Sequence, residues 1–231
     1  MHKANLQVQL ILVNFTPLGE VFRGDDVLQI QSTNQTIGDI AANGFAIGYG
    51  NFACGDITAQ SSYPEEWQGL YLENNWLFDD PVVRTGLTTP GLSSWSRQDF
   101  DDPAFRDAAS DFNLTTGTVI SHEVDGHRCI LGIAHTGQLT EAAEDAAQNA
   151  LRELHHTHLR NRALQLSTTQ RELVYLFANG HKAKRVAAHF GVSEDAIKQR
   201  KQIIQRVVGV NSFISAVSIC ATAGLTIHPI S

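Results

Sequence analysis

Aromatic side chains and one carboxylate crowd into a short stretch of the chain. The set comprises Tyr63, Trp67, Tyr71, Asp80 before Pro81, and Trp95. Rings of this kind can bury an apolar ligand, while one acceptor and a few donors fix its polar head. The residue types therefore predict a closed pocket for a small molecule with one polar end. For any single ring, core packing remains the simpler interpretation, and for the Asp-Pro pair it is a turn.

Other patterns that could support catalysis or metal binding are weak. The histidines at 155, 156 and 158 have no Cys or carboxylate arrangement beside them, so we expect an exposed helix end rather than a metal site. Cys54, Cys129 and Cys220 are odd in number and widely spaced, which favours reduced thiols over a disulfide or zinc framework. No nucleophile elbow, phosphate loop or dinucleotide fingerprint is found. We expect neither an enzyme nor a cofactor beyond a small-molecule effector.

Charge divides the 231 residues into two parts. Residues 1–160 carry 8 basic and 21 acidic side chains, a net of −13, whereas residues 161–231 carry 9 and 3, a net of +6. A basic module of this kind suits a phosphate-binding surface. The apolar run Leu6 to Val13 is too short to cross a bilayer and lacks the flanks of an export signal, so we expect a cytoplasmic protein with no membrane partner.

The basic part has the pattern of a compact helical DNA-binding unit. Helices are expected over 168–178 and 183–190, and over about 194–208 after Ser193, with Gly180, Gly191 and Gly209 as the breaks. Two short helices joined by a Gly-containing turn are typical of a helix-turn-helix. On the third helix the apolar and polar positions separate onto two faces. The expected DNA contacts are Lys182, Lys184, Lys198, Gln199, Arg200, Lys201, Gln202, Gln205 and Arg206.

The acidic part reads as a mixture of strands and helices. Residues 5–43 suggest helical segments around a polar loop, followed by strands over 44–51 and 57–61 and a short helix over 64–71. Two apolar runs, 116–124 and 128–135, meet at Asp125-Gly126, which is a strong hairpin signal. A helix capped by Thr140 should cover the sheet, and 158–165 is the expected linker.

Two motif sets resemble one family. The stretch from Leu166-Ser167 through Ala178-Asn179-Gly180 and Phe190-Gly191-Val192-Ser193 to Gly209-Val210-Asn211 resembles the C-terminal helix-turn-helix of LuxR-type regulators. The spacing Trp67-x3-Tyr71-x8-Asp80-Pro81-x13-Trp95 resembles the acyl-homoserine-lactone-binding domain of the quorum-sensing members. The resemblance implies an autoinducer-binding domain over 1–160 and a DNA-binding domain over 161–231.

The resemblance also implies roles for individual residues. Asp80 would accept the ligand amide N–H, Trp67 would donate to the lactone carbonyl and Tyr63 to the acyl carbonyl. Tyr71 and Trp95 would supply ring faces. From hydrophobic pattern alone, Val82, Ile120 and Leu131 are expected to line the acyl tail.

The fold that follows is α+β. It is expected to be an N-terminal α-β-α sandwich with a central antiparallel sheet, plus a C-terminal all-α four-helix helix-turn-helix domain. The expected partners are double-stranded DNA at an inverted repeat, an acyl-homoserine lactone, a second copy of the chain and RNA polymerase. Ile214, Val217 and Ala221 recur at helical spacing and suit either core packing or a homodimer contact.

Two departures from the family pattern leave other functions open. Gly132 lies where many members of the family have Ser or Thr, and the interval from Trp95 to Gly117 is shorter than is common. Both features suit a ligand-independent regulator or anti-activator with a vestigial pocket. A small-molecule hydrolase is the second alternative, and a lack of lactone turnover would exclude it.

Overall fold

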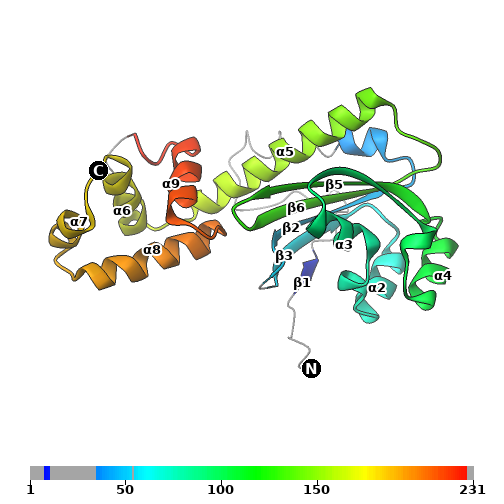
Figure 1. Ribbon diagram of the computed structural model, residues 1–231, viewed down its shortest axis with the longest axis horizontal. Helices are drawn as coiled ribbons and strands as arrows, with labels where there is room; N and C mark the ends of the chain where they lie inside the picture. Colours follow the sequence, from blue (N-terminus) through cyan, green and yellow to red (C-terminus); the bar gives the residue numbers. More distant parts are fainter. Residues whose placement is uncertain (1–7, 11–34, 54, 228–231) are drawn as a thin grey trace. The chain divides into compact units, whose positions relative to one another are not determined.

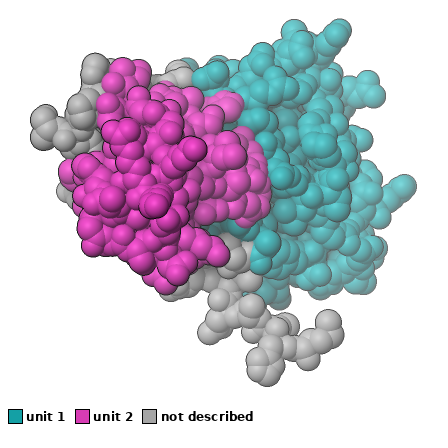
Figure 2. Space-filling model, turned by 60° about the vertical axis from the view of Figure 1, so that its left-hand side comes forward, with its two compact units in different colours: residues 1–123, 128–155 teal, residues 124–127, 156–231 magenta. Residues whose placement is uncertain are grey.

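The computed structural model describes residues 8–10, 35–53 and 55–227. The chain divides into two compact units, shown in Figure 2. Unit 1 comprises residues 1–123 and 128–155, and unit 2 comprises residues 124–127 and 156–231. Each unit has its own buried core. The functional boundary expected near residue 160 stays a prediction.

Unit 1 is built on an antiparallel sheet. Its strands are β2 (Phe45–Asn51), β3 (Asp56–Ser61), β4 (Gly91–Ser96), β5 (Thr116–Val124) and β6 (His127–Ala134), in the order β3-β2-β6-β5-β4. A further strand, β1 (Val8–Leu10), pairs in parallel with β3 at the edge. The sheet confirms the expected α+β class with a central antiparallel sheet.

The sequence signals for the central strands are local ones. Strands β5 and β6 meet at Asp125 and Gly126, whose φ angles of 47° and 85° are both positive, as a two-residue hairpin turn requires. Strand β2 lies between β3 and β6, with Ala46 opposite both Ser61 and Gly132. This register decides which side chains of β2, β3 and β6 share a face.

Helices cover both faces of the sheet, as Figure 1 shows. The first part of α5 (Glu141–Leu164) packs on one face together with a short helix over residues 35–40. The opposite face carries α2 (Glu65–Glu73), α3 (Pro81–Thr88) and α4 (Pro103–Asp111), with short 3-10 turns at Trp76–Phe78 and Arg97–Asp99. The expected sandwich layering is therefore present in unit 1.

Two local expectations were wrong. Helical segments were expected over residues 5–43; a helix over residues 35–40 confirms this in part, but Val8–Leu10 is a strand, and residues 11–34 lie outside the described residues. The linker expected over 158–165 is instead helical almost to its end, because α5 runs without a break to Leu164. Buried Leu159 and Ala163 explain this continuity, since they pack in the core of unit 2.

Over its described residues unit 2 contains four further helices, and the boundaries of the first three match the expected ones. They are α6 (Thr168–Ala178), α7 (Ala183–Phe190), α8 (Glu194–Val208) and α9 (Phe213–Thr222). Ser167, Ser193 and Ser212 each accept a backbone N–H at a helix start, and left-handed Gly191 and Gly209 end α7 and α8. Leu173, Val186, Ile197, Ile204 and Ala216 form their shared core.

Among the described residues, no single helix is long and apolar enough to cross a membrane. Helices α8 and α9 meet those criteria only as a pair bent by 56°. In this structure both helices contribute to the buried core of unit 2.

Candidate functional site

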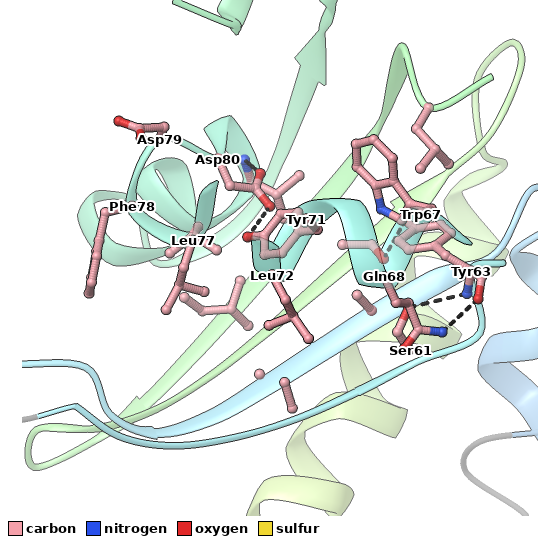
Figure 3. Close-up of a pocket in the computed structure, with 18 of the residues that line it drawn as sticks. Ser61, Tyr63, Trp67, Gln68, Tyr71, Leu72, Leu77, Phe78, Asp79 and Asp80 are labelled. Atoms are coloured by element: carbon pink, nitrogen blue, oxygen red, sulfur yellow. Dashed lines mark hydrogen bonds between the residues drawn. The ribbon is translucent and has the colours of Figure 1, made fainter. Parts of the chain in front are cut away.

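Unit 1 encloses a cavity of about 780 Å³ between the sheet and helices α2 to α4. Figure 3 shows the part of its wall formed by α2, the turn after it and the start of α3. The strands contribute Ala46, Gly48, Ile57, Ala59, Ile130 and Gly132, and further lining comes from Phe100, Phe105 of α4 and Leu114. The volume lies within the range of small-molecule sites.

Two carboxylates lie on this wall, Asp79 and Asp80, and Asp80 is the more buried of them. It is the N-cap of α3, where Oδ1 accepts the backbone N–H of Val82 at 2.8 Å and Pro81 occupies the first helical position. Oδ2 accepts the hydroxyl of Tyr71 at 2.9 Å (Figure 3). The cap and the tyrosine fix the carboxylate, leaving further lone pairs for a ligand donor.

Burial changes the acidity of both groups in this pair. Removal from water raises the pKa of Asp80 from 3.8 to about 6, although hydrogen bonds from Val82, Tyr71 and Val83 oppose the shift. The pKa of Tyr71 is raised well above 10, first by burial and then by the neighbouring carboxylate. Asp80 is therefore largely ionised at pH 7 and desolvated, which favours a ligand that offers it an N–H or O–H.

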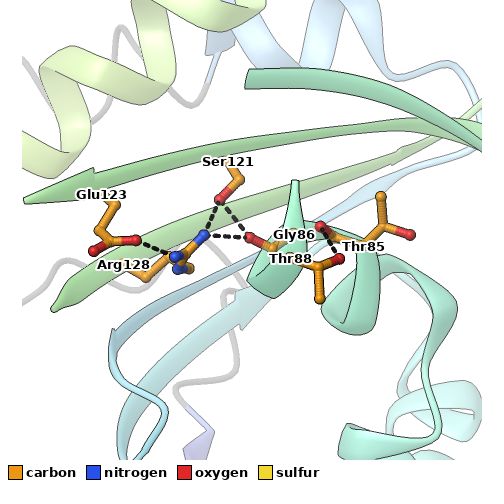
Figure 4. Close-up of polar contacts among 6 residues, drawn as sticks. All are labelled: Thr85, Gly86, Thr88, Ser121, Glu123 and Arg128. Carbon is orange, nitrogen blue, oxygen red and sulfur yellow. Dashed lines mark hydrogen bonds and ion pairs between the residues drawn. The ribbon is translucent and has the colours of Figure 1, made fainter. Parts of the chain in front are cut away.

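A polar cluster at the other end of α3 holds the helix in place, as Figure 4 shows. The carbonyl of Gly86 accepts from the Ser121 hydroxyl at 2.6 Å and from the Arg128 guanidinium at 2.8 Å. Arg128 also pairs with Glu123. Gly86 itself lies so close to Ile130 that an added Cβ would be 2.6 Å from its side chain. These contacts fix the position of Asp80 relative to the sheet.

Stacked rings form part of the cavity wall, through Trp67, Phe100 and Phe105, and the core behind it, through Trp76. Trp67 lies 5.8 Å from Phe105, and Phe105 lies 4.6 Å from Trp76 in parallel stacking, while Phe100 meets Phe105 edge-on at 5.0 Å. Pairs in these geometries are each worth about 0.5–1.5 kcal/mol beyond their buried area. The wall is rigid for that reason.

The structure brings together six of the eight expected ligand residues. Tyr63, Trp67, Tyr71, Asp80, Val82 and Trp95 all line the cavity. Ile120 and Leu131 do not, and that expectation was wrong. Successive strand residues point to opposite faces, so Ile130 and Gly132 face the cavity while Leu131 packs under α5. Ile120 lies in the same cluster as Leu131.

Several lining residues were not expected from the sequence. Small residues on alternate strand positions, namely Ala46, Gly48, Ala59 and Gly132, leave the space that the cavity occupies. Their alternation with large residues was the available signal. Gln68 was also missed. Trp95 was expected only to supply a ring face, and its buried Nε1 has no hydrogen-bond partner within the described part of the chain.

Gly132 has a structural reason for lacking a side chain. A Cβ at this position would lie 2.7 Å from Cγ1 of Val82, the residue after Pro81 in α3. Val82 therefore leaves no room for a side chain at position 132. The hydroxyl of Tyr63 lies nearby, 3.5 Å from the Gly132 carbonyl oxygen.

The expected DNA contacts are only partly exposed. Lys182, Lys184, Lys198, Gln199, Gln202 and Arg206 lie at the surface, together with Arg185, which the sequence reasoning missed. Lys201 instead lies over the rings of Phe177 and Phe213, at 3.7 and 4.8 Å, and partial burial lowers its pKa. A cation held between two rings is less free to reach a phosphate.

Two other side chains of α8 also have intramolecular contacts. Arg200 lies 5.2 Å from the ring centre of Phe190, and Gln205 donates to the carbonyl of Asn211. Ile203, placed on the apolar side by helical projection, is exposed. The exposed residues of α8 are therefore Glu194 and Asp195 in its first turn, followed by Lys198, Gln199, Gln202, Ile203 and Arg206.

The histidines expected at an exposed helix end lie elsewhere. His155 is fully buried, and its Nδ1 lies 2.8 Å from Nδ1 of His122. His156 is exposed and His158 is partly buried. Among the residues that the structure describes, no group of His, Cys, Asp and Glu has the arrangement of a metal site.

Comparison with known proteins identifies the class to which this geometry belongs. Residues 49–160 match the autoinducer binding domain family. This match and the relatives below support a LuxR-type quorum-sensing regulator.

Individual relatives support this placement. The chain is 28% identical to the HTH-type quorum sensing-dependent transcriptional regulator RpaR of Rhodopseudomonas palustris, over 74% of this chain and 75% of the relative. It is 22% identical to the HTH-type quorum-sensing regulator RhlR of Pseudomonas aeruginosa, over 71% and 74%. The crystal structure of Escherichia coli SdiA superposes with a TM-score of 0.52 at 16% identity, over 90% of this chain and 94% of that one, which shows a shared fold.

Proposed function

We propose that unit 1 binds an N-acyl homoserine lactone and that residues 161–231 bind an inverted-repeat DNA site as a homodimer, so that the ligand controls transcription. The desolvated carboxylate of Asp80 inside an aromatic cavity is the observation that carries the proposal. The family assignment supports it, because the matched domain is one that binds autoinducers.

The polar groups of the cavity match the polar groups of such a ligand. Asp80 accepts the amide N–H, Tyr63 donates to a carbonyl, Trp67 offers its indole N–H to a remaining oxygen, and Trp95 supplies a ring face. The acyl chain lies against apolar residues such as Val82, Ile57 and Leu77. Each buried methylene contributes about 0.8 kcal/mol, so affinity rises with chain length until the cavity is full.

The DNA-binding part of the proposal rests on charge and on α8. The net charge of residues 161–231 is +6, and α8 presents an ammonium, two amides and a guanidinium outward. Amides pair bidentately with adenine, and cations contact phosphates or guanine. A two-fold dimer places two such helices about 34 Å apart, one DNA turn.

Thermal melting with lactones of graded chain length tests ligand binding. A ligand at 100 times its Kd stabilises the folded state by about 2.7 kcal/mol. We expect such a shift for the wild type and its loss in Asp80→Asn, which keeps the shape and removes the anionic acceptor. Equal shifts in both proteins would refute the role of Asp80, and no shift at any chain length would refute lactone binding.

The DNA surface can be tested with two lysines of the same helix. Lys198→Ala should weaken binding to a specific fragment and reduce the salt dependence of log K by about one unit, because an exposed cation is lost. Lys201→Ala should leave the salt slope nearly unchanged, since Lys201 packs on Phe177 and Phe213. Fluorescence anisotropy titrations measure both slopes. A larger loss of salt dependence in Lys201→Ala than in Lys198→Ala would show that a different face binds DNA.

Gly132 motivates a second candidate, a ligand-independent regulator. Val82 fills the space where a hydroxyl contact is otherwise expected. A dimer that binds DNA equally well with and without lactone would favour this candidate. The size of the cavity favours the ligand-binding function instead.

A further inference from the structure

The turn of the β5–β6 hairpin, residues 124–127, belongs to unit 2, although most of both strands belongs to unit 1. In this turn, Asp125 accepts two backbone N–H groups from the α8–α9 corner, residues 209–212. Its carbonyl oxygen accepts the N–H of Asn211 at 3.0 Å, and its Oδ2 accepts the N–H of Ser212 at 2.6 Å. Ser212 is the N-cap of α9, so a carboxylate lies at the positive end of that helix. The hairpin turn therefore stabilises the start of α9.

The other residues of the turn also pack in unit 2. Val124 contacts the buried core of the unit. Gly126 comes so close to Asn211 that an added Cβ would lie 2.0 Å from its Nδ2. His127 is fully buried, and a Cβ on Gly209 would lie 2.8 Å from its ring. Gly209 ends α8, the helix proposed to read DNA, so the turn contacts the ends of both helices.

The strands of the same hairpin hold α3, whose first turn lines the cavity. The carbonyl of Gly86, in the last turn of α3, accepts from Ser121 of β5 at 2.6 Å and from Arg128 of β6 at 2.8 Å (Figure 4). Carbonyls in the last turn have no partner within their own helix, so these bonds fix that end of α3. At its other end, Asp80 and Val82 line the cavity. A ligand bound to Asp80 therefore restrains the helix that the hairpin holds.

We propose that the β5–β6 hairpin couples the ligand cavity to the helix that reads DNA. Only Gly126 and His127 separate Asp125 from Arg128, so α3 and the α8–α9 corner are bonded to one short turn. A bound lactone restrains α3, α3 restrains the hairpin, and the turn keeps α8 and α9 in the arrangement that binds DNA. The proposal rests on the proposed function and adds the path by which the ligand acts.

Coupling of this kind is reciprocal and measurable. If the lactone raises the affinity for DNA by some factor, DNA raises the affinity for the lactone by the same factor, and factors of about 5 to 150 are typical. The factor compares one protein with itself. A variant that binds lactone or DNA more weakly on its own therefore keeps its coupling factor unless the path between the two sites is broken.

Titration of the full chain with DNA, with and without lactone, gives the factor. The lactone is the member of the graded series that raises the melting temperature most, and the duplex is selected from a random pool by its binding to the lactone-saturated protein. The reverse titration, with lactone in the presence and absence of the duplex, checks reciprocity. We expect a factor above about 5 for the wild type in both directions.

Two variants break the path at different points. Asp125→Gly removes the carboxylate and keeps a turn that requires positive φ, and Arg128→Met removes the donors to α3. Each should lower the coupling factor to below about 2. Asp125→Asn keeps an acceptor for the Ser212 N–H and should keep the factor. Arg152→Met, exposed on α5, is the matched control and should also keep it.

Hydrogen exchange of the wild type tests the same path without a substitution. The lactone alone should slow the exchange of the Asn211 and Ser212 amides, which donate to Asp125, by up to about the coupling factor. The amides of α6 are the internal reference and should change less. If a variant does not fold, as judged by its melting curve, this measurement decides.

The outcomes separate the two proposals. A wild-type factor retained in Asp125→Gly and Arg128→Met, an equal loss in Arg152→Met, or unchanged exchange of the two amides while the lactone raises DNA affinity would overturn the role of the hairpin. Each of these results leaves ligand control of DNA binding intact. A wild type that binds no lactone, or that binds it with no effect on DNA affinity, would overturn the proposed function, and this inference with it.

Discussion

The two faces of the sheet in unit 1 differ in the size of their side chains. On the face under α5, Phe45, Ile47, Leu131 and Ile133 fill the space up to the helix. On the other face, the alternating positions of the same strands carry small residues, Ala46, Gly48 and Gly132. One set of strands therefore supports a packed core on one side and a cavity on the other.

The difference shows how a binding site can exist without weakening the sheet that carries it. The packed face supplies the hydrophobic stabilisation, because burial of its large side chains is complete. The cavity face contributes less packing and keeps space enclosed by rings and by Asp80. Substitutions on the two faces should therefore affect different properties.

The largest effect on stability is expected from Leu131→Ala. This change removes a fully buried side chain from the packed face and should lower the free energy of unfolding by about 2–5 kcal/mol. The lactone preferences of the protein that remains folded should be unchanged. Urea denaturation measures the first quantity and calorimetry the second. A loss below about 1 kcal/mol would show that this face is not the stabilising one.

A pH-dependent effect is expected from Asp80→Asn in the absence of ligand. The folded pKa of Asp80 is about 6, above the unfolded value of 3.8. As pH rises, the carboxyl of Asp80 ionises first in the unfolded chain and only near pH 6 in the folded one. The stabilisation of the folded state by protonated Asp80 is therefore complete below about pH 4 and is lost as pH rises to about 6. One pKa unit corresponds to about 1.4 kcal/mol. The variant should therefore gain about 2–2.5 kcal/mol on the wild type between pH 4 and pH 7.

Denaturation of both proteins across this pH range measures the gain. Subtracting the free energy of unfolding of the wild type from that of the variant at each pH removes the contributions of the other titrating groups. A stability difference that does not change with pH would mean that the carboxylate is not desolvated in the cavity.

A smaller effect is expected from Gly132→Ser. The new Cβ would lie 2.7 Å from Val82, a stiff side chain in α3, so overpacking should cost about 1–3 kcal/mol. Adding Val82→Ala should recover part of this loss, which a double-mutant cycle detects. If the two substitutions are additive, the close approach of strand β6 and α3 does not limit this position.

The sequence predicted those elements whose signals are local. The Asp125-Gly126 turn and the Ser193 cap of α8 each fix a boundary through neighbouring atoms, and the structure confirms them. Helix α3 was missed because Asp80-Pro81 was taken only as a turn. The pair is in fact the N-cap and first residue of a helix.

The faces of the central strands could not be predicted in the same way. Residues 129–133 are nearly all apolar, so the run gives no alternation from which to assign Ile130 to the cavity and Leu131 to the core under α5. That assignment depends on pairing with β2, which is set by residues about 80 positions away. Aromatic residues and Asp80 were easier to assign because their spacing resembles that of a known family.

The most direct test of the central claim is to identify what the cavity retains. Wild type and Ala59→Leu, which fills the cavity from strand β3, are produced in cells given a mixture of acyl-homoserine lactones, and solvent extracts of the purified proteins are analysed by mass spectrometry. We expect about one lactone per wild-type chain and almost none in the variant, with both proteins folded. No lactone in the wild type, or equal amounts in both proteins, would contradict the account.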